Sequence, residues 1–383
     1  MNLDLTEDQR VVRDAVRELC EREFAPFAPG WDHEGIVPRD AVSKLAEQGF
    51  LGMAIPEEWG GVGYDSRTIV VVLEEIARVS AALAIMIAVH NSVGALPVFR
   101  FGNDVQRHRF LPRLVSRELA AFSLSEPGAG SDAAAIESTA VRQGDTYVLN
   151  GSKNWVTNGQ QAGVYLIFAR TEKAAGNRGL SAFIVERGVP GLVIGNPEDK
   201  MGLRGSDTVS LSLEDLRVPA DQRLGEEGEG FKIAMSMLDA GRIGVGAQAL
   251  GVMCAAFGEA VRYAQIRKAF GQPIAKIQAM QFKLAEMERR IQCSRLLIQR
   301  AAWLKDLGQP YTREAAMAKL YASEAATWVT HAAIQVHGGY GYVKEYAVER
   351  YYRDARVMEI YEGTSEIQRL VIARSLLKDG VTV

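Results

Sequence analysis

The sequence predicts a multidomain α and β protein: an N-terminal helical domain at 1–118, a central small β-barrel or sandwich at 119–225 and a C-terminal four-helix bundle at 226–383. Two patterns predict this order. Apolar residues recur at helical spacing in the first and last parts of the chain. The middle part has short runs that alternate or are β-branched, separated by Gly, Asn and Pro. The length of 383 residues is sufficient for a large core.

The N-terminal part contains four predicted helices, at 6–24, 39–50, 66–102 and 105–119. Thr6 and Gln9 form a capping box at the start of the first helix. The segment "PEEWGGVGYDS" at 56–66 is a glycine-rich loop. The most apolar run, "AALAIMIAVH", has about half the length that a bilayer requires, so we expect a buried helix and no membrane span.

The middle and C-terminal parts follow the same two patterns. Predicted strands lie at 146–159, 164–171, 180–188 and 208–219, with a hairpin turn expected at Asn150 in "NGS". Long helices are predicted at 228–267, 278–307 and 312–337, and antiparallel helices of this length indicate a bundle. A shorter helix ends the chain, with Ser365 expected as the N-cap of a capping box that includes Gln368.

Composition and motifs exclude several classes of function. The formal net charge of −3 gives no basic surplus for binding nucleic acid. The three cysteines are far apart, so we expect neither zinc nor a disulfide framework and favour a reducing compartment. No signal peptide is visible, which favours a bacterial-type cytoplasm, although a mature mitochondrial chain would look similar. Walker, Rossmann, HExxH and GxSxG motifs are absent from the sequence, and the histidines have no metal-ligand spacing.

Four segments are difficult to explain by packing alone. They are "AFSLSEPGAGSD" at 121–132, "NWVTNG" at 154–159, "RKAFGQPIAKIQAMQF" at 267–282 and "QVHGGYGYVKEY" at 335–346. Loops with small hydroxyls and close glycines expose N–H groups to a polar ligand. A Trp can stack on a planar group, and an Arg can bind phosphate. Each segment also has an ordinary explanation, namely a turn, a core tryptophan, a surface ion pair and a helix C-cap.

Taken together, these segments resemble the acyl-CoA dehydrogenase family over essentially the whole chain. "AFSLSEPGAGSD" resembles its first signature, and residues 335–369, which end in "YEGTSEIQR", resemble its second. The resemblance implies an FAD enzyme that oxidises the C2–C3 bond of an acyl-CoA to trans-2-enoyl-CoA and passes electrons to electron-transferring flavoprotein. It also implies a homotetramer with FAD bound across a subunit interface. The nearest likeness is to the short-chain (butyryl-CoA) and short/branched-chain members.

The resemblance also implies residue roles. Expected FAD contacts are Phe122, Leu124, Ser125, Ser131, Trp155, Thr157, Arg267, Phe270, Gln278, Gln335, Gly338, Gly339, Thr364 and Glu366. Within this set, residues from 267 to 339 are expected to contact the FAD of a neighbouring subunit. Expected substrate contacts are Ser131, Asp239, Arg242, Gln248 and Gly363. Gln248 and Met358 resemble residues that shorten the acyl pocket, which implies a short acyl chain.

Glu362 occupies the position of the family's general base. Alone, a carboxylate before a helix has a simpler explanation, because the helix macrodipole favours it. Some family members carry the base immediately before the equivalent of Arg242, but this chain has Gly241 there. In the family, the backbone N–H of the base residue polarises the thioester carbonyl. An acyl-CoA oxidase and a non-catalytic acyl-CoA- or flavin-binding relative are the alternative functions.

Overall fold

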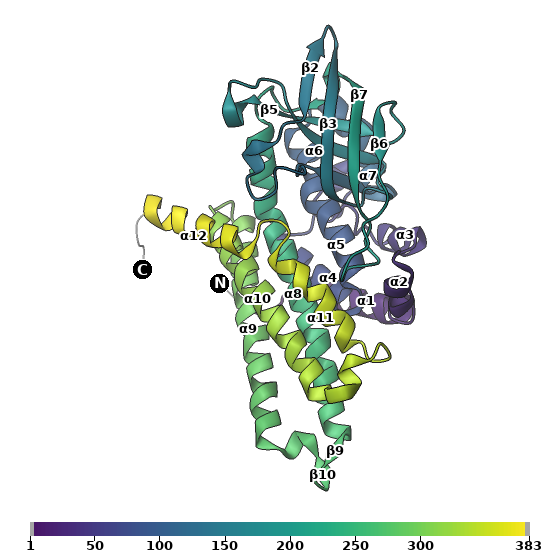
Figure 1. The fold of residues 1–383 in the computed structure, drawn as a ribbon, viewed down its shortest axis with the longest axis vertical. Helices are drawn as coiled ribbons and strands as arrows, with labels where there is room; N and C mark the ends of the chain where they lie inside the picture. Colours follow the sequence, from purple (N-terminus) through teal and green to yellow (C-terminus); the bar gives the residue numbers. More distant parts are fainter. Residues whose placement is uncertain (1–3, 380–383) are drawn as a thin grey trace.

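The computed structural model describes residues 4–379 and has the three-part architecture that the sequence predicts, with a β domain at one end of a long helical bundle (Figure 1). The N-terminal part contains seven α-helices within the described residues: α1 (Glu7–Glu23), α2 (Ala28–Glu34), α3 (Arg39–Glu47), α4 (Ser66–Val79), α5 (Ala81–Val89), α6 (Leu96–Phe101) and α7 (Asp104–Ser116). The capping box at α1 is confirmed, because the Gln9 N–H donates to Thr6 Oγ1 at 3.2 Å and the Thr6 N–H donates to Gln9 Oε1 at 3.2 Å.

The single helix expected at 66–102 is divided in the structure. Ser80 adopts an extended conformation between α4 and α5, and its hydroxyl accepts the Leu83 N–H at 3.2 Å. A π-helical segment, His90–Ala95, then separates α5 from α6. All nine residues of α5 are buried. Ala81–Phe101 and Gly230–Ile266 are long and apolar enough to cross a membrane, but their most apolar stretches are 89% and 72% buried, as in the core helices of a folded domain.

The middle part forms one eight-stranded sheet in the order β6-β7-β3-β2-β4-β5-β8, with β1 paired in parallel to β4. The strands are β1 (Ala120–Ser123), β2 (Thr139–Gln143), β3 (Thr146–Thr157), β4 (Val164–Arg170), β5 (Leu180–Glu186), β6 (Leu192–Ile194), β7 (Thr208–Pro219) and β8 (Arg223–Leu224). The hairpin turn expected at Asn150 is wrong. Asn150 lies inside β3, beside an irregularity in the pairing with β7, and its side chain bonds Asp215 across the pair.

The C-terminal part begins with the 37-residue helix α8 (Gly230–Ile266), which packs against both α4 and α10. A short hairpin of β9 (Lys268–Ala269) and β10 (Gln272–Pro273) leads to α9 (Gln278–Asp306) and α10 (Thr312–His337). Helices α11 (Val348–Arg356) and α12 (Ser365–Asp379) complete the bundle. The expected N-cap of α12 is wrong by one residue, because Thr364 Oγ1 accepts the Ile367 N–H at 3.3 Å.

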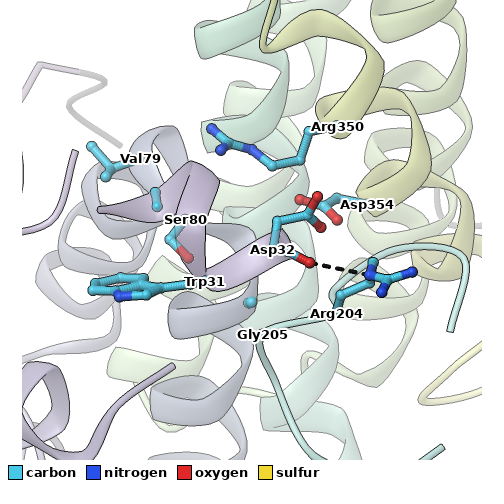
Figure 2. Close-up of a pocket in the computed structure, with 10 residues that line it drawn as sticks. Trp31, Asp32, Val79, Ser80, Arg204, Gly205, Arg350 and Asp354 are labelled. Atoms are coloured by element: carbon cyan, nitrogen blue, oxygen red, sulfur yellow. Dashed lines mark hydrogen bonds between the residues drawn. The ribbon is translucent and has the colours of Figure 1, made fainter. Parts of the chain in front are cut away.

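The three parts meet at a small pocket between α2, the β6–β7 connection and α11 (Figure 2). Asp32 and Asp354 both line this pocket, and Arg204 Nε donates to the Asp32 carbonyl at 3.1 Å. The Leu203 N–H also donates to Asp354 Oδ1 at 2.6 Å. None of the residues expected in the functional site lines this pocket, so we regard it as a domain junction.

Candidate active site

The loop after β1 is held by a buried ion pair. Lys153 Nζ donates to Glu126 Oε1 at 2.6 Å and to the Leu124 carbonyl at 3.3 Å. Glu126 also accepts the backbone N–H groups of Glu137 and Ser138 at 2.6 and 3.0 Å. Buried charges are stabilised when they are paired and hydrogen-bonded in this way. The pair therefore ties the first signature segment to β3.

The predicted flavin residues of this loop differ in exposure. Phe122 is half-buried and packs against Phe168, with ring centroids 4.9 Å apart. The Ser125 carbonyl accepts the Asn154 N–H at 2.9 Å, so the loop runs beside β3. Leu124 is buried, and Ser131 is exposed at the far side of the turn. The loop thus presents polar groups from a fixed backbone.

A bulge in β3 turns Trp155 outward. Lys153 and Val156 are both buried, and the pairing with β7 shifts register between them. Bulges near functional sites commonly redirect one side chain. Trp155 has φ +61° and is 63% exposed. Thr157 ends the strand and is half-buried.

The loop that contains Glu362 has an unusual backbone. The φ angles are +50° at Glu362 and +93° at Gly363. Gln368 Nε2 donates to the carbonyls of these two residues at 3.2 and 2.9 Å. Lys319 Nζ donates to the Gly363 carbonyl at 2.7 Å. Helix α12 starts directly afterwards, capped by Thr364, so both ends of the turn are fixed.

The Glu362 carboxylate lies against α8 at Gly241. A Cβ atom at Gly241 would lie 2.2 Å from Glu362 Oε2 and 2.9 Å from its Cδ. Only glycine therefore leaves room for the carboxylate. Gly241 lies about three turns into α8, which begins at Gly230 in close contact with Ser181 of β5. The first turns of α8 lie beside the β domain (Figure 1), so the contact with Gly241 places Glu362 near that end of the bundle.

The electrostatic environment sets the ionisation of Glu362 near neutrality. Burial raises the pKa of Glu362 to about 7, and the positive charges of Lys319 and Arg242 oppose that rise. Burial also lowers the pKa of Lys319 to about 8, against the attraction of the Glu362 carboxylate. A general base is most effective when its pKa lies near the operating pH. The arrangement is therefore suited to proton abstraction.

Asp239 and Arg242 form an ion pair on α8 beside this turn. Arg242 Nη1 donates to Asp239 Oδ1 at 2.6 Å, and Thr312 Oγ1 donates to Asp239 Oδ2 at 2.5 Å. Both Asp239 and Arg242 are largely buried. Burial raises the pKa of Asp239. The pair presents both charges close to the Glu362 loop from a rigid helix.

Unsatisfied polar atoms cluster at this turn. Among the described residues, buried polar atoms without a partner include Glu362 Oε2, Arg242 Nε, Ser365 Oγ and Gln368 Oε1. Ser123 Oγ, at the end of β1, is also unpartnered. Buried polar groups are rarely left without hydrogen bonds. This concentration indicates a place where a polar ligand or water completes the bonding.

Gln248 is bonded to Tyr361, the residue directly before Glu362. It is fully buried on α8; its Nε2 donates to the Ala81 carbonyl at 2.7 Å and its Oε1 accepts the Tyr361 hydroxyl. Met358, on the turn before Glu362, is also fully buried.

A second cavity of about 440 Å³ of empty space, partly open to solvent, lies between α4, α5–α6 and α8, with Lys305 among mainly apolar lining residues.

The remaining predicted FAD residues lie at the opposite end of the bundle. Arg267 and Phe270 belong to the hairpin region after α8, which Figure 1 places farthest from the β domain. Phe270 is 94% exposed with φ +52°. Every member of this distal group is exposed: Arg267, Phe270, Gln278, Gln335, Gly338 and Gly339. Glu366, at the start of α12, is exposed too, but it belongs with the Glu362 turn.

Four residues of the site were not singled out for it from the sequence. Lys319 stands alone among alanines in "AMAKLYASEAA", and helical periodicity does not show that it is fully buried. The Glu126–Lys153 pair joins two segments far apart in sequence. Tyr361 precedes the predicted base, but its bond to Gln248 is a tertiary contact. An isolated lysine within an apolar helical stripe was the available signal.

The residues present fit a flavin cofactor. Trp155 offers an exposed aromatic surface on a bulge, and Ser123 Oγ is a buried hydroxyl without a partner. Thr157 on β3 and the backbone of the loop 122–125 add further polar groups, and β1 contacts β3. A planar aromatic cofactor needs a stacking surface and a few polar groups of this kind. Trp155, Thr157 and the loop 122–125 would hold its ring system.

The fold and site together define a flavin-dependent oxidoreductase. Family models match three consecutive segments: acyl-CoA dehydrogenase N-terminal domain (6–118), middle domain (121–216) and C-terminal domain (228–377). The chain belongs to the acyl-CoA dehydrogenase family. It is an FAD-dependent oxidoreductase, as the resemblance in its sequence implied.

Similar proteins include enzymes named for short-chain substrates. The mitochondrial short-chain specific acyl-CoA dehydrogenase of Mus musculus is 48% identical over 98% of this chain and 92% of the relative. The butyryl-CoA dehydrogenase structure from Megasphaera elsdenii has a TM-score of 0.97 and 44% identity, covering 98% of this chain and all (100%) of that chain. A chain from a structural study of the electron transferring flavoprotein of Acidaminococcus fermentans has a TM-score of 0.97 and 45% identity, covering 99% of this chain and 100% of that chain.

Proposed function

We propose that the protein oxidises a short-chain acyl-CoA at its C2–C3 bond to trans-2-enoyl-CoA, with Glu362 as the general base. One observation carries this proposal: Glu362 Oε2 lies against Gly241 without a hydrogen-bond partner among residues 4–379, and the pKa of Glu362 is raised to about 7. An α-proton beside a thioester needs a positioned base and stabilisation of the enolate that develops.

The residues around Glu362 have separate roles in the proposed reaction. Glu362 Oε2 accepts the C2 proton, while the charges of Lys319 and Arg242 favour the ionised carboxylate. The Glu362 N–H makes no hydrogen bond within the described residues, so it is free to donate to the thioester oxygen. Bound FAD supplies the acceptor for the C3 hydrogen. Asp239 and Arg242 bind the CoA part, and Gly363 lets the backbone approach the thioester.

The proposed preference for short acyl chains rests on Gln248, which we place at the closed side of the acyl site. The side-chain amide of Gln248 is bonded at one end to the Ala81 carbonyl and at the other to the Tyr361 hydroxyl. These two bonds prevent the amide from moving aside. Removing either partner would leave a buried polar group unpaired, which is costly. The names of the two similar enzymes, a short-chain specific and a butyryl-CoA dehydrogenase, support the same length. Butyryl-CoA is therefore the first substrate to test.

We further propose assembly into a homotetramer that completes the cofactor site. Arg267 and the Glu362 turn contact α8 about 25 residues apart, which is roughly 40 Å along a helix, so the two predicted FAD-binding groups of one chain cannot contact one dinucleotide. A Cβ at Gly339 would meet no atom of residues 4–379 within 4 Å, so no contact in this part of the chain explains that glycine. The exposed distal group is suited to the FAD of another copy.

Electron-transferring flavoprotein is the proposed electron acceptor. The matching chain from the study of that flavoprotein in Acidaminococcus fermentans supports this choice. Reduced protein mixed with an electron-transferring flavoprotein in the absence of air should be reoxidised. Hydrogen peroxide formed in air at the rate of turnover would instead identify an acyl-CoA oxidase.

The experiment that tests substrate choice is an anaerobic titration followed by the visible flavin spectrum. Butyryl-CoA should bleach the flavin faster than octanoyl-CoA or dodecanoyl-CoA. Gln248→Ala should shift the preference towards longer chains, because it opens the closed side of the site. Fastest bleaching by dodecanoyl-CoA in the parent protein would overturn the short-chain assignment and leave the reaction class intact.

A further inference from the structure

Lys319 is an unusual residue for the middle of a helix. Its side chain is fully buried in α10, although lysine is rarely buried unless it is paired. The hydrogen bond recorded for its ammonium group within the described residues is to a backbone carbonyl, that of Gly363, at 2.7 Å. A charged donor forms a stronger hydrogen bond than a neutral one. The lysine therefore holds the turn that carries the base.

The turn needs such an anchor because its conformation is unfavourable for an ordinary residue. Glu362 has φ +50°, a region that side chains other than glycine rarely adopt. Residues in such regions persist where the surrounding structure holds them. Gln368 donates to the Glu362 and Gly363 carbonyls from one side, and Lys319 donates to the Gly363 carbonyl from the other. The Glu362 N–H itself makes no hydrogen bond to any residue that the structure describes.

We propose that Lys319 is a positioning residue for catalysis: its ammonium group fixes the Gly363 carbonyl, holds the Glu362 carboxylate over Gly241 and favours the ionised form of that carboxylate. Gln368 shares the first two of these roles through its bonds to the Glu362 and Gly363 carbonyls, but it cannot favour the ionised carboxylate because it is neutral. This inference rests on the proposed function, in which Glu362 is the base.

The charges around this pair are defined. Glu362 faces Lys319 from α10 and Arg242 from α8, with Tyr361 next to it in the chain. Lys319 faces Glu362 and Arg242, and further away Glu359 and Glu324. Loss of Lys319 leaves Arg242 as the remaining cation that lowers the pKa of Glu362. The pKa of Glu362 should then rise.

The test compares Lys319→Met with Gln368→Met in the FAD-loaded protein. Both variants remove a donor to the turn, so both should bleach with butyryl-CoA on the order of 10- to 100-fold more slowly, as expected for misplacement of a reacting group. Only Lys319→Met removes a charge. In Lys319→Met, the pH at which kcat/KM reaches half of its maximum should therefore be higher than in the parent protein. In Gln368→Met, this pH should be the same as in the parent protein.

A control and a second readout separate positioning from packing. Thr330→Val is the matched control, because Thr330 is also buried in α10 and bonds the Ala326 carbonyl of its own helix. It should change neither rate nor pH profile. Infrared titration of the protonated carboxyl band, with Glu362→Gln as the blank, should show a higher pKa of Glu362 in Lys319→Met without any substrate.

The outcomes separate the two proposals. Lys319→Met with the parent rate, pH profile and infrared titration would overturn the positioning role, and Glu362 could still be the base. Full activity of Glu362→Gln would overturn the proposed function itself. If Lys319→Met does not fold, Gln368→Met still tests the proposal. A parent rate of bleaching in Gln368→Met would show that the bonds to the carbonyls of the turn do not position the base.

Discussion

The ionisation of a single carboxylate sets the expected pH dependence. Burial raises the pKa of Glu362 to about 7, and Lys319 and Arg242 limit that rise. A base accepts a proton only when it is ionised. We expect kcat/KM with butyryl-CoA to fall about tenfold per pH unit below pH 7 and to level off above it. Steady-state kinetics across this pH range measures the fall in kcat/KM. The control is a flavin spectrum, taken before substrate is added, that is the same at each pH. A flat profile from about pH 5 to about pH 8 would contradict the assignment of the base.

The space at Gly241 can be tested independently of charge. In Gly241→Ala, the new Cβ would lie 2.2 Å from Glu362 Oε2, so the carboxylate must move. We expect flavin bleaching by butyryl-CoA to slow at least about tenfold. The unfolding temperature should stay the same or rise, because alanine is favoured over glycine in a helix interior by roughly 0.5–1 kcal/mol. A parent rate of bleaching would show that the carboxylate does not need this space.

At the scale of residues, the sequence alone reached the position of Glu362 only through the family resemblance. Its own pattern, a carboxylate before a helix, has a purely structural explanation. The sequence predicted the N-cap of α12 at Ser365, whereas the structure has it at Thr364. Both residues have a hydroxyl group, and only the backbone conformation determines which hydroxyl accepts an N–H of the first turn. Lys319 could not be placed in the site, because helical spacing does not show which neighbour a buried lysine meets.

At the scale of elements, close helix packing in α8 depends on glycine. A Cβ at Gly251 would lie 2.3 Å from the Glu74 carbonyl and 2.7 Å from Ala77 Cβ, both on α4. Gly258, on the same helix, would meet nothing within 4 Å. Helix α8 therefore contacts α4 through a surface that has no room for a side chain at position 251.

These two glycines form a matched pair for stability. Gly251→Ala should lower the free energy of unfolding by about 1–3 kcal/mol, because the crowded atom is backbone and cannot turn aside. Gly258→Ala should raise it by roughly 0.5–1 kcal/mol through helix propensity. Chemical denaturation of both variants measures the difference. Equal effects of the two substitutions would mean that α4 and α8 do not pack as described.

Long helices were more predictable than short elements. The predicted helix at 312–337 coincides with α10, because apolar periodicity over many turns averages out local exceptions. The break at Ser80 and the short helix α2 were not predicted, because a few residues carry too little periodicity. Asn150 looked like a turn, but pairing between β3 and β7 keeps it inside a strand. Tertiary contacts decided these cases.

At the scale of the whole molecule, the distal end of the bundle is exposed and apolar. Ile266, Phe270, Phe282 and Tyr342 are 75%, 94%, 65% and 86% exposed. Apolar surface that is grouped in this way generally marks an interface. This supports the proposed assembly and the contribution of one copy to the FAD site of another.

Assembly can be tested with one substitution. Phe270→Asp should produce a smaller species in analytical ultracentrifugation and retain less FAD, because a charge would be buried in the proposed interface. Val105→Asp is the matched control, since Val105 is 72% exposed on α7 in the N-terminal part. It should change neither mass nor FAD content. A Phe270→Asp protein of parent mass with full FAD content would argue against this interface.

The most direct test of the account as a whole is anaerobic mixing of Glu362→Gln with butyryl-CoA, followed by the flavin spectrum. Glutamine keeps the size of the side chain but cannot accept the C2 proton. The account predicts that the variant keeps its FAD and binds butyryl-CoA, and that bleaching slows by about 100- to 10,000-fold relative to the parent protein. Bleaching at the parent rate would contradict the central claim that Glu362 is the catalytic base.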